Sequence, residues 1–159
     1  MPIRIRWLSK DRLGIALMFL GACGLFQVLF IFIAQYLAKV GNYLVLIVIP
    51  MGVTLALFFS AIIIYESFIQ IKRREKLRSP YKKADTIEKK LIKFLSFPIV
   101  RPILIIIGVF TAFYLISFFV SLAFFPNLIA FVLAENIAAV SALLIANYIE
   151  TRYAKIRKY

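Results

Sequence analysis

Residues 102–134, PILIIIGVFTAFYLISFFVSLAFFPNLIAFVLA, decide the fold, because this long run contains no charged side chain. An α-helix needs roughly 20 apolar residues to cross the hydrocarbon core of a bilayer, so the run is too long for one span. Phe125-Pro126-Asn127 lies within it, and a proline followed by an asparagine is a natural turn. The run therefore predicts two membrane-spanning helices joined by a short turn.

Two other runs, residues 13–38 and 40–65, are also free of charge, and residues 127–149 are interrupted only by Glu135. Each is long enough to span a membrane. The sequence thus predicts an all-α integral membrane protein with four transmembrane helices in two hairpins, at about 13–37, 43–66, 100–124 and 127–149. The whole chain forms a single membrane domain in this interpretation, made of a basic arm (1–12), hairpin 1 (13–66), a basic loop (67–99), hairpin 2 (100–149) and a basic tail (150–159).

The charge is confined to one side of these spans. The chain has 20 Lys+Arg against 7 Asp+Glu, a net charge of +13, and the segments 1–12, 66–101 and 150–159 carry all the basic residues except Lys39. The positive-inside rule assigns that side to the cytoplasm, so we expect both termini and the central loop to face inward. We expect a multi-pass protein of the cell membrane.

Basic residues beside a membrane span attract anionic lipid headgroups, with about 1 kcal/mol for each Lys or Arg. Nucleic-acid binding is the weaker interpretation, because every basic cluster flanks a span and no aromatic platform accompanies it. We therefore expect membrane lipids, and no nucleic acid, at the basic face.

The composition excludes several kinds of chemistry. The chain has no histidine and one cysteine, Cys23, so it has no disulfide framework, no Cys/His metal cluster and no His-based triad. Glu135 and Glu150 lie about 22 Å apart along one helix, too far for an acid/base pair. We expect a protein without catalytic residues, metal or cofactor. Because the apolar run continues past Cys23, we also expect no cleavage there.

The central loop has helical features of its own. The second span is expected to continue as a helix until Ser79-Pro80. Asp85 and Glu88 resemble a capping box that begins a short amphipathic helix. Its apolar face consists of Ile87, Leu91, Phe94 and Leu95. Such a helix either lies in the headgroup plane or covers the surface of a partner protein.

Glu135 is the most informative residue within the spans. It lies eight residues inside the fourth span, about 12 Å from its outer end. A carboxyl at this depth indicates a functional site with a polar partner, or else a protonated packing residue. The candidate partners are Gln27, Gln35, Asn136 and Lys39.

Small residues follow two lines along the same span. Ala134, Ala138 and Ser141 form one line, and Ala139, Ala142 and Ala146 form the other. Such lines let helices approach closely, so they predict packing seams more than a substrate groove.

The stretch IAAVSALLIANYIETRY, residues 137–153, resembles the end of the last helix in the GtrA-like family, and residues 20–24, LGACG, resemble its first helix. The resemblance implies a role in translocating or anchoring polyprenyl-phosphate-linked sugars, with a glycosyltransferase as one expected partner. It also implies that Asn147, Arg152 and Tyr153 lie on the headgroup side. An arginine there can bind a phosphate in bidentate geometry, and Arg101 at the start of the third span is a further candidate. The alternative is a helix end whose long side chains extend to the interface.

A second hypothesis is a non-catalytic accessory subunit of a larger membrane complex. The near absence of catalytic groups, the small-residue seams and the short outer loops favour it. Its partner would be a larger membrane assembly, or further copies of the chain in a homo-oligomer.

Overall fold

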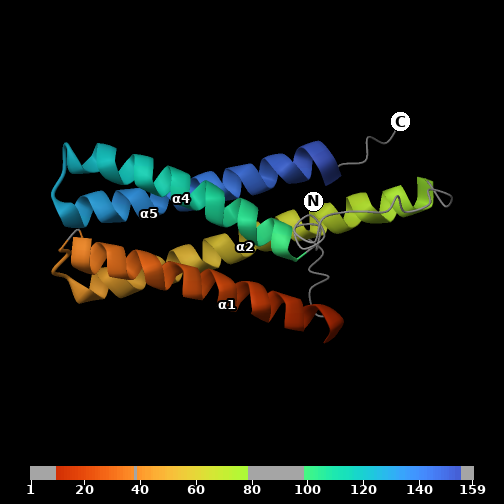
Figure 1. The fold of residues 1–159 in the computed structure, drawn as a ribbon, viewed down its shortest axis with the longest axis horizontal. Helices are drawn as coiled ribbons and strands as arrows, with labels where there is room; N and C mark the ends of the chain where they lie inside the picture. The colour runs from red at the N-terminus through yellow and green to blue at the C-terminus, as the bar shows by residue number, and fades with distance from the viewer. Residues whose placement is uncertain (1–9, 38, 79–98, 155–159) are drawn as a thin grey trace, which may run out of the picture.

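The computed structural model describes residues 10–37, 39–78 and 99–154, which contain helices and no strands (Figure 1). The helices are α1 (Lys10–Phe32), α2 (Tyr43–Arg78), α4 (Val100–Leu122) and α5 (Asn127–Ile149). A π-helical turn follows α1 (η2, Ile33–Leu37), and another follows α5 (η3, Glu150–Ala154). The expected amphipathic helix after Asp85 lies outside the described residues, as do residues 1–9 of the basic arm and 155–159 of the tail.

Within the described ranges, four helices are long and apolar enough to cross a membrane, as the sequence predicts. The spans are Leu13–Tyr36, Tyr43–Gln70, Val100–Leu122 and Asn127–Arg152. The all-helical, four-span architecture is therefore confirmed, and it indicates a multi-pass membrane protein. As expected, α2 continues beyond its span to Arg78, which gives it 36 residues and a length of about 54 Å.

The helices form two antiparallel hairpins whose turns lie at the same end of the molecule (Figure 1). The start of α1, the start of α4 and the end of α5 lie at the opposite end. Lys39 is therefore separated by the length of the bundle from Arg101 and Arg152. Which end of the bundle faces the cytoplasm is a prediction from the positive-inside rule.

The turn between α1 and α2 is closed by backbone hydrogen bonds. Lys39 has a φ of 49°, and the Val40 amide donates to the carbonyl of Ala34, six residues earlier, at 3.1 Å. Asn42 then caps α2, because its Oδ1 accepts from the amide of Leu44 at 3.1 Å. These interactions satisfy backbone groups that would otherwise be left free at two helix ends.

α5 packs extensively against both α4 and α2. Its buried face is made largely of alanines, which allow the neighbouring helices to approach closely. The buried alanines are Ala130, Ala134, Ala138, Ala139, Ala142 and Ala146. The two predicted small-residue lines are thus buried at helix seams, apart from Ser141, which is half-buried.

The backbones of α1 and α4 approach each other at only a few points, and aromatic rings fill the space between them. The ring of Phe30 on α1 meets those of Phe110 and Tyr114 on α4 at centroid distances of 5.1 and 4.5 Å, both edge to face. Edge-to-face pairs of this kind add to the energy of burial. α1 and α5 make almost no direct contact, so they lie on a diagonal of the bundle, with α2 and α4 between them.

Candidate functional site

A groove of about 630 Å³ lies at the end of the bundle where α4 begins and α5 ends. It is lined by Phe68, Arg101, Ile105, Ile145, Tyr148 and Ile149. Arg101 is the one charged residue among them, so we call this feature the Arg101 groove. Its other walls are aliphatic and aromatic side chains from α2, α4 and α5.

Two arginines are held beside aromatic rings at this groove. The guanidinium of Arg101 lies 5.4 Å from the ring centroid of Phe68, which places a cation from α4 against α2. The guanidinium of Arg152 lies 5.5 Å from the ring centroid of Tyr148, one helical turn earlier in the chain. Both distances are within the range of cation–π attraction, which orients a guanidinium and leaves its N–H groups available for other contacts.

The arrangement suits an amphiphilic anion. Guanidinium groups bind phosphate and carboxylate oxygens in a fork geometry, and apolar walls accommodate hydrocarbon. Arg101 and Arg152 are both exposed, so a ligand can reach them without first displacing protein. The groove thus combines a cationic rim with an apolar body.

Of the predicted headgroup residues, Arg101 lines this groove, and Arg152 does not line it but lies against Tyr148, which does. Asn147 is exposed and does not line it, because it is rotated about 100° around the helix from Tyr148. Tyr153 lies in η3, and its side chain is outside the described part of the structure. Phe68 and Tyr148, which hold the arginines, were not predicted.

A second polar feature lies inside the membrane-spanning part of the bundle. Glu135 on α5 and Tyr114 on α4 are each 0% exposed, and Gln27 on α1 is 2% exposed. We call these three residues the buried polar cluster. They lie about 12–14 Å from the outer ends of their spans, so all three are at the same depth.

Glu135 lies close enough to Gln27 and Tyr114 to interact with both, although no hydrogen bond joins these groups. The carboxyl oxygens of Glu135, the amide atoms of Gln27 and the hydroxyl of Tyr114 have no hydrogen-bond partner among the described residues. Buried polar atoms are nearly always hydrogen-bonded, and leaving one unpaired costs about 1–3 kcal/mol. The cluster therefore has unused capacity to donate and accept hydrogen bonds.

Among the four predicted partners of Glu135, the structure places Gln27 beside it. Gln35 is exposed, and Lys39 is exposed in the turn. Asn136 is exposed and donates from Nδ2 to the Val132 carbonyl of its own helix at 2.7 Å. Tyr114 was missed, although its spacing of four residues from both Phe110 and Phe118 places all three on one face of α4.

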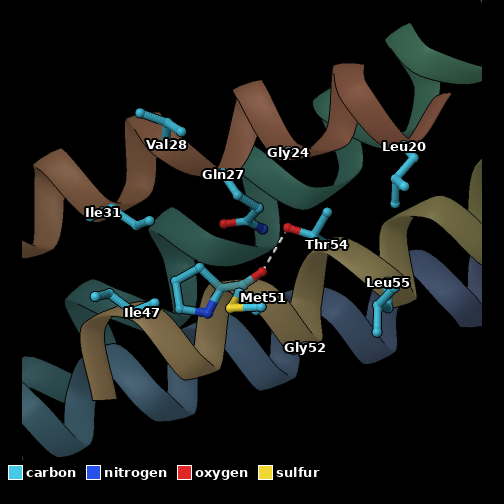
Figure 2. A pocket seen from close by; sticks show the side chains of 11 residues that line it. Leu20, Gly24, Gln27, Val28, Ile31, Ile47, Met51, Gly52, Thr54 and Leu55 are labelled. Atoms are coloured by element: carbon cyan, nitrogen blue, oxygen red, sulfur yellow. Dashed lines mark hydrogen bonds between the residues drawn. The ribbon is translucent and has the colours of Figure 1, made fainter. Parts of the chain in front are cut away.

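Gln27 also lines a groove between α1 and α2, with a volume of about 470 Å³ (Figure 2). Its walls are mostly apolar, and the other side chain with a polar atom is Thr54. Thr54 donates from Oγ1 to the Pro50 carbonyl at 2.7 Å. We call this feature the α1/α2 groove.

Within the described ranges, no three His, Cys, Asp or Glu residues are grouped so that they could hold a metal ion. Cys23, the one cysteine of the chain, is buried.

No protein-family model matches the chain, and no curated protein or solved structure is significantly similar to it. The two grooves and the buried polar cluster are therefore the basis for a functional proposal.

Proposed function

We propose that this protein binds polyprenyl-phosphate-linked sugars at the Arg101 groove and helps to translocate or anchor them. One observation carries the proposal: an apolar groove at the basic end of a four-span bundle is lined by Arg101, which lies against Phe68. Arg152 lies against Tyr148, another residue that lines the groove. Such a groove matches a ligand that joins a phosphate to a long hydrocarbon chain.

The position of the groove supports a lipid rather than a water-soluble phosphate. Its apolar walls, Ile105, Ile145 and Ile149, belong to the membrane-spanning segments of α4 and α5. Arg101 is at the first turn of α4, where a span meets the headgroup region. A lipid placed here would keep its chain in hydrocarbon and its phosphate near the guanidinium groups.

The polyprenyl chain and the sugar are taken from the resemblance of residues 137–153 to the GtrA-like family. In this proposal the protein lies in the cell membrane with its basic end at the cytoplasmic face. It has no catalytic activity of its own. Its partner is a glycosyltransferase or further copies of the chain. Anionic lipid headgroups surround the same face.

Native mass spectrometry of the purified protein in mild detergent tests the proposal, with polyprenyl phosphate and the corresponding polyprenol as ligands. The wild type is expected to prefer the phosphate. Arg101→Ala is expected to reduce that preference about tenfold, since a charge-assisted hydrogen bond contributes about 1.5–3 kcal/mol. Lys39→Ala is the matched control, because Lys39 is an exposed basic residue at the other end of the bundle.

Equal effects of the Arg101 and Lys39 changes would contradict the proposal. The same spectra report protein partners. A wild type that shows no preference for the phosphate and remains bound to a larger membrane assembly would favour the accessory-subunit hypothesis instead.

A further inference from the structure

The α1/α2 groove differs in its chemistry from the Arg101 groove. The described residues that line it include no charged side chain, and its side-chain nitrogen and oxygen atoms are those of Gln27 and Thr54. Thr54 and Phe68 are 14 residues apart on α2, so the two grooves lie about 21 Å from each other along that helix. A phosphate would find no cation among the residues that line this second groove.

Gln27 is the decisive residue of the α1/α2 groove. Its side chain extends from α1 toward Thr54 on α2 (Figure 2). It is 2% exposed, and neither its amide nitrogen nor its amide oxygen has a hydrogen-bond partner among the described residues. A buried amide in this state is an open donor and an open acceptor side by side.

The neighbours of Gln27 limit which groups satisfy it. Thr54 uses its proton on the Pro50 carbonyl, so its oxygen remains an acceptor. A ligand hydroxyl can accept from the amide nitrogen of Gln27, and another can donate to the amide oxygen or to Thr54. A ligand group that only donates or only accepts hydrogen bonds leaves the Gln27 nitrogen, the Gln27 oxygen or the Thr54 oxygen unpaired. Hydroxyl groups both donate and accept, so they can pair with all three atoms.

The residues around the groove indicate which kind of ligand can bring hydroxyl groups to it. Exposed apolar residues flank it on both helices, including Val28 on α1 and Met51 on α2, and both belong to membrane-spanning segments. The groove thus opens toward hydrocarbon, so its ligand needs an apolar part that keeps it in the bilayer. A hydroxyl-bearing group attached to a lipid chain has such a part.

We infer that the α1/α2 groove binds the uncharged, hydroxyl-rich head of a glycolipid, with Gln27 and Thr54 as the binding residues. The inference rests on the proposed function in taking the glycolipid to be the sugar-bearing ligand of the Arg101 groove.

A neutral glycolipid tests the inference without involving the phosphate. Monoglucosyl-diacylglycerol and diacylglycerol share their apolar part and differ in the sugar, and their binding is compared by native mass spectrometry in mild detergent. The wild type is expected to prefer the glucosyl lipid. Gln27→Leu is expected to reduce this preference fivefold to tenfold through the loss of the amide hydrogen bonds, and Thr54→Val about threefold.

Gln35→Leu is the matched control, since Gln35 belongs to the same span but is exposed and does not line the groove. It is expected to leave the preference unchanged. Gln27→Leu removes an unpaired polar group, so its melting temperature should equal or exceed that of the wild type, and lost binding will not reflect unfolding.

Two results would overturn the inference. If the wild type binds both lipids equally, the groove holds an ordinary lipid chain. If the Gln27 and Gln35 variants lose the preference equally, Gln27 is not the binding residue. Neither result bears on the proposed function, which depends on Arg101 and on the choice between polyprenyl phosphate and polyprenol.

Discussion

Gln27 on α1 and Glu135 on α5 interact across the diagonal of the bundle, although their helices do not pack against each other over any length. Two side chains on diagonal helices can meet only in the central space of a four-helix arrangement. The buried polar cluster therefore occupies the centre of the membrane-spanning core, where water cannot compensate for unmade hydrogen bonds.

Replacing Glu135 by leucine is expected to stabilise the protein. The carboxyl is fully buried and has no hydrogen-bond partner among the described residues, so its removal relieves a cost of about 1–3 kcal/mol. Thermal unfolding in detergent measures the change. Asn136→Leu is the control, because this exposed side chain bonds only to its own helix, and we expect a change within about 0.5 kcal/mol. A lower melting temperature for Glu135→Leu would show that the carboxyl has a stabilising partner.

Ala138→Leu is expected to destabilise the bundle by about 1–3 kcal/mol, because Ala138 is 0% exposed on the face of α5 that meets its neighbours. The added methyl groups must push two helices apart. Val140→Leu, at an exposed position of the same helix, should leave the free energy of unfolding nearly unchanged. Chemical unfolding in mixed micelles compares the two variants, and equal effects would rule out a close seam at Ala138.

Phe30→Ala is expected to cost about 3 kcal/mol in the free energy of unfolding. Its ring contacts Phe26, Phe110 and Tyr114, and it is a main link between α1 and α4. Phe32→Ala, at an exposed ring two residues later, removes only the stacking with Tyr36 and should cost about 1 kcal/mol or less. The same unfolding measurement separates these outcomes, and a similar loss for both rings would argue against the aromatic link.

Phe68→Leu is expected to weaken binding of polyprenyl phosphate about twofold to fivefold. Leucine keeps the apolar wall of the groove but removes the ring against which the Arg101 guanidinium lies, an interaction of about 0.5–1 kcal/mol. Phe59→Leu, an exposed position on the same helix, is the control. Titration followed by native mass spectrometry checks both variants, and unchanged binding by Phe68→Leu would show that the stacked geometry of Arg101 is not used.

The orientation in the membrane can be tested by cysteine labelling. Cys23 is buried, so the wild type should not react with a membrane-impermeant maleimide. Lys39→Cys should be labelled in intact cells, and Thr151→Cys only after the membrane is permeabilised, because these exposed positions lie at opposite ends of the bundle. The reverse pattern would place the basic end outside and contradict the positive-inside assignment.

The spans were predictable because their length and lack of charge are imposed by the thickness of the bilayer. Glu135 was predictable as an intramembrane carboxyl for the same reason. Its partners were not, because helices that are apolar on all sides do not reveal which face meets the protein. Gln27 lies in α1 and Gln35 in the π-helical turn η2 that follows it, and only the packing of the other helices decides which one faces inward.

The lining of the Arg101 groove was also not predictable, because the sequence does not reveal which helix faces meet one another. Arg101, Arg152 and Asn147 were all predictable as polar residues near helix ends, but only Arg101 of the three lines the groove. Tyr114 was missed because the span contains many aromatic residues, and the sequence does not show that the neighbouring helices bury this one hydroxyl.

The seams between the helices differ in what fills them. α5 meets α2 and α4 along faces lined with alanines, so these backbones approach closely. α1 packs along α2, but it meets α4 mainly through aromatic rings that contact one another edge to face. A shift of α1 relative to α4 would therefore rearrange rings, whereas a shift of α5 would separate closely packed backbones.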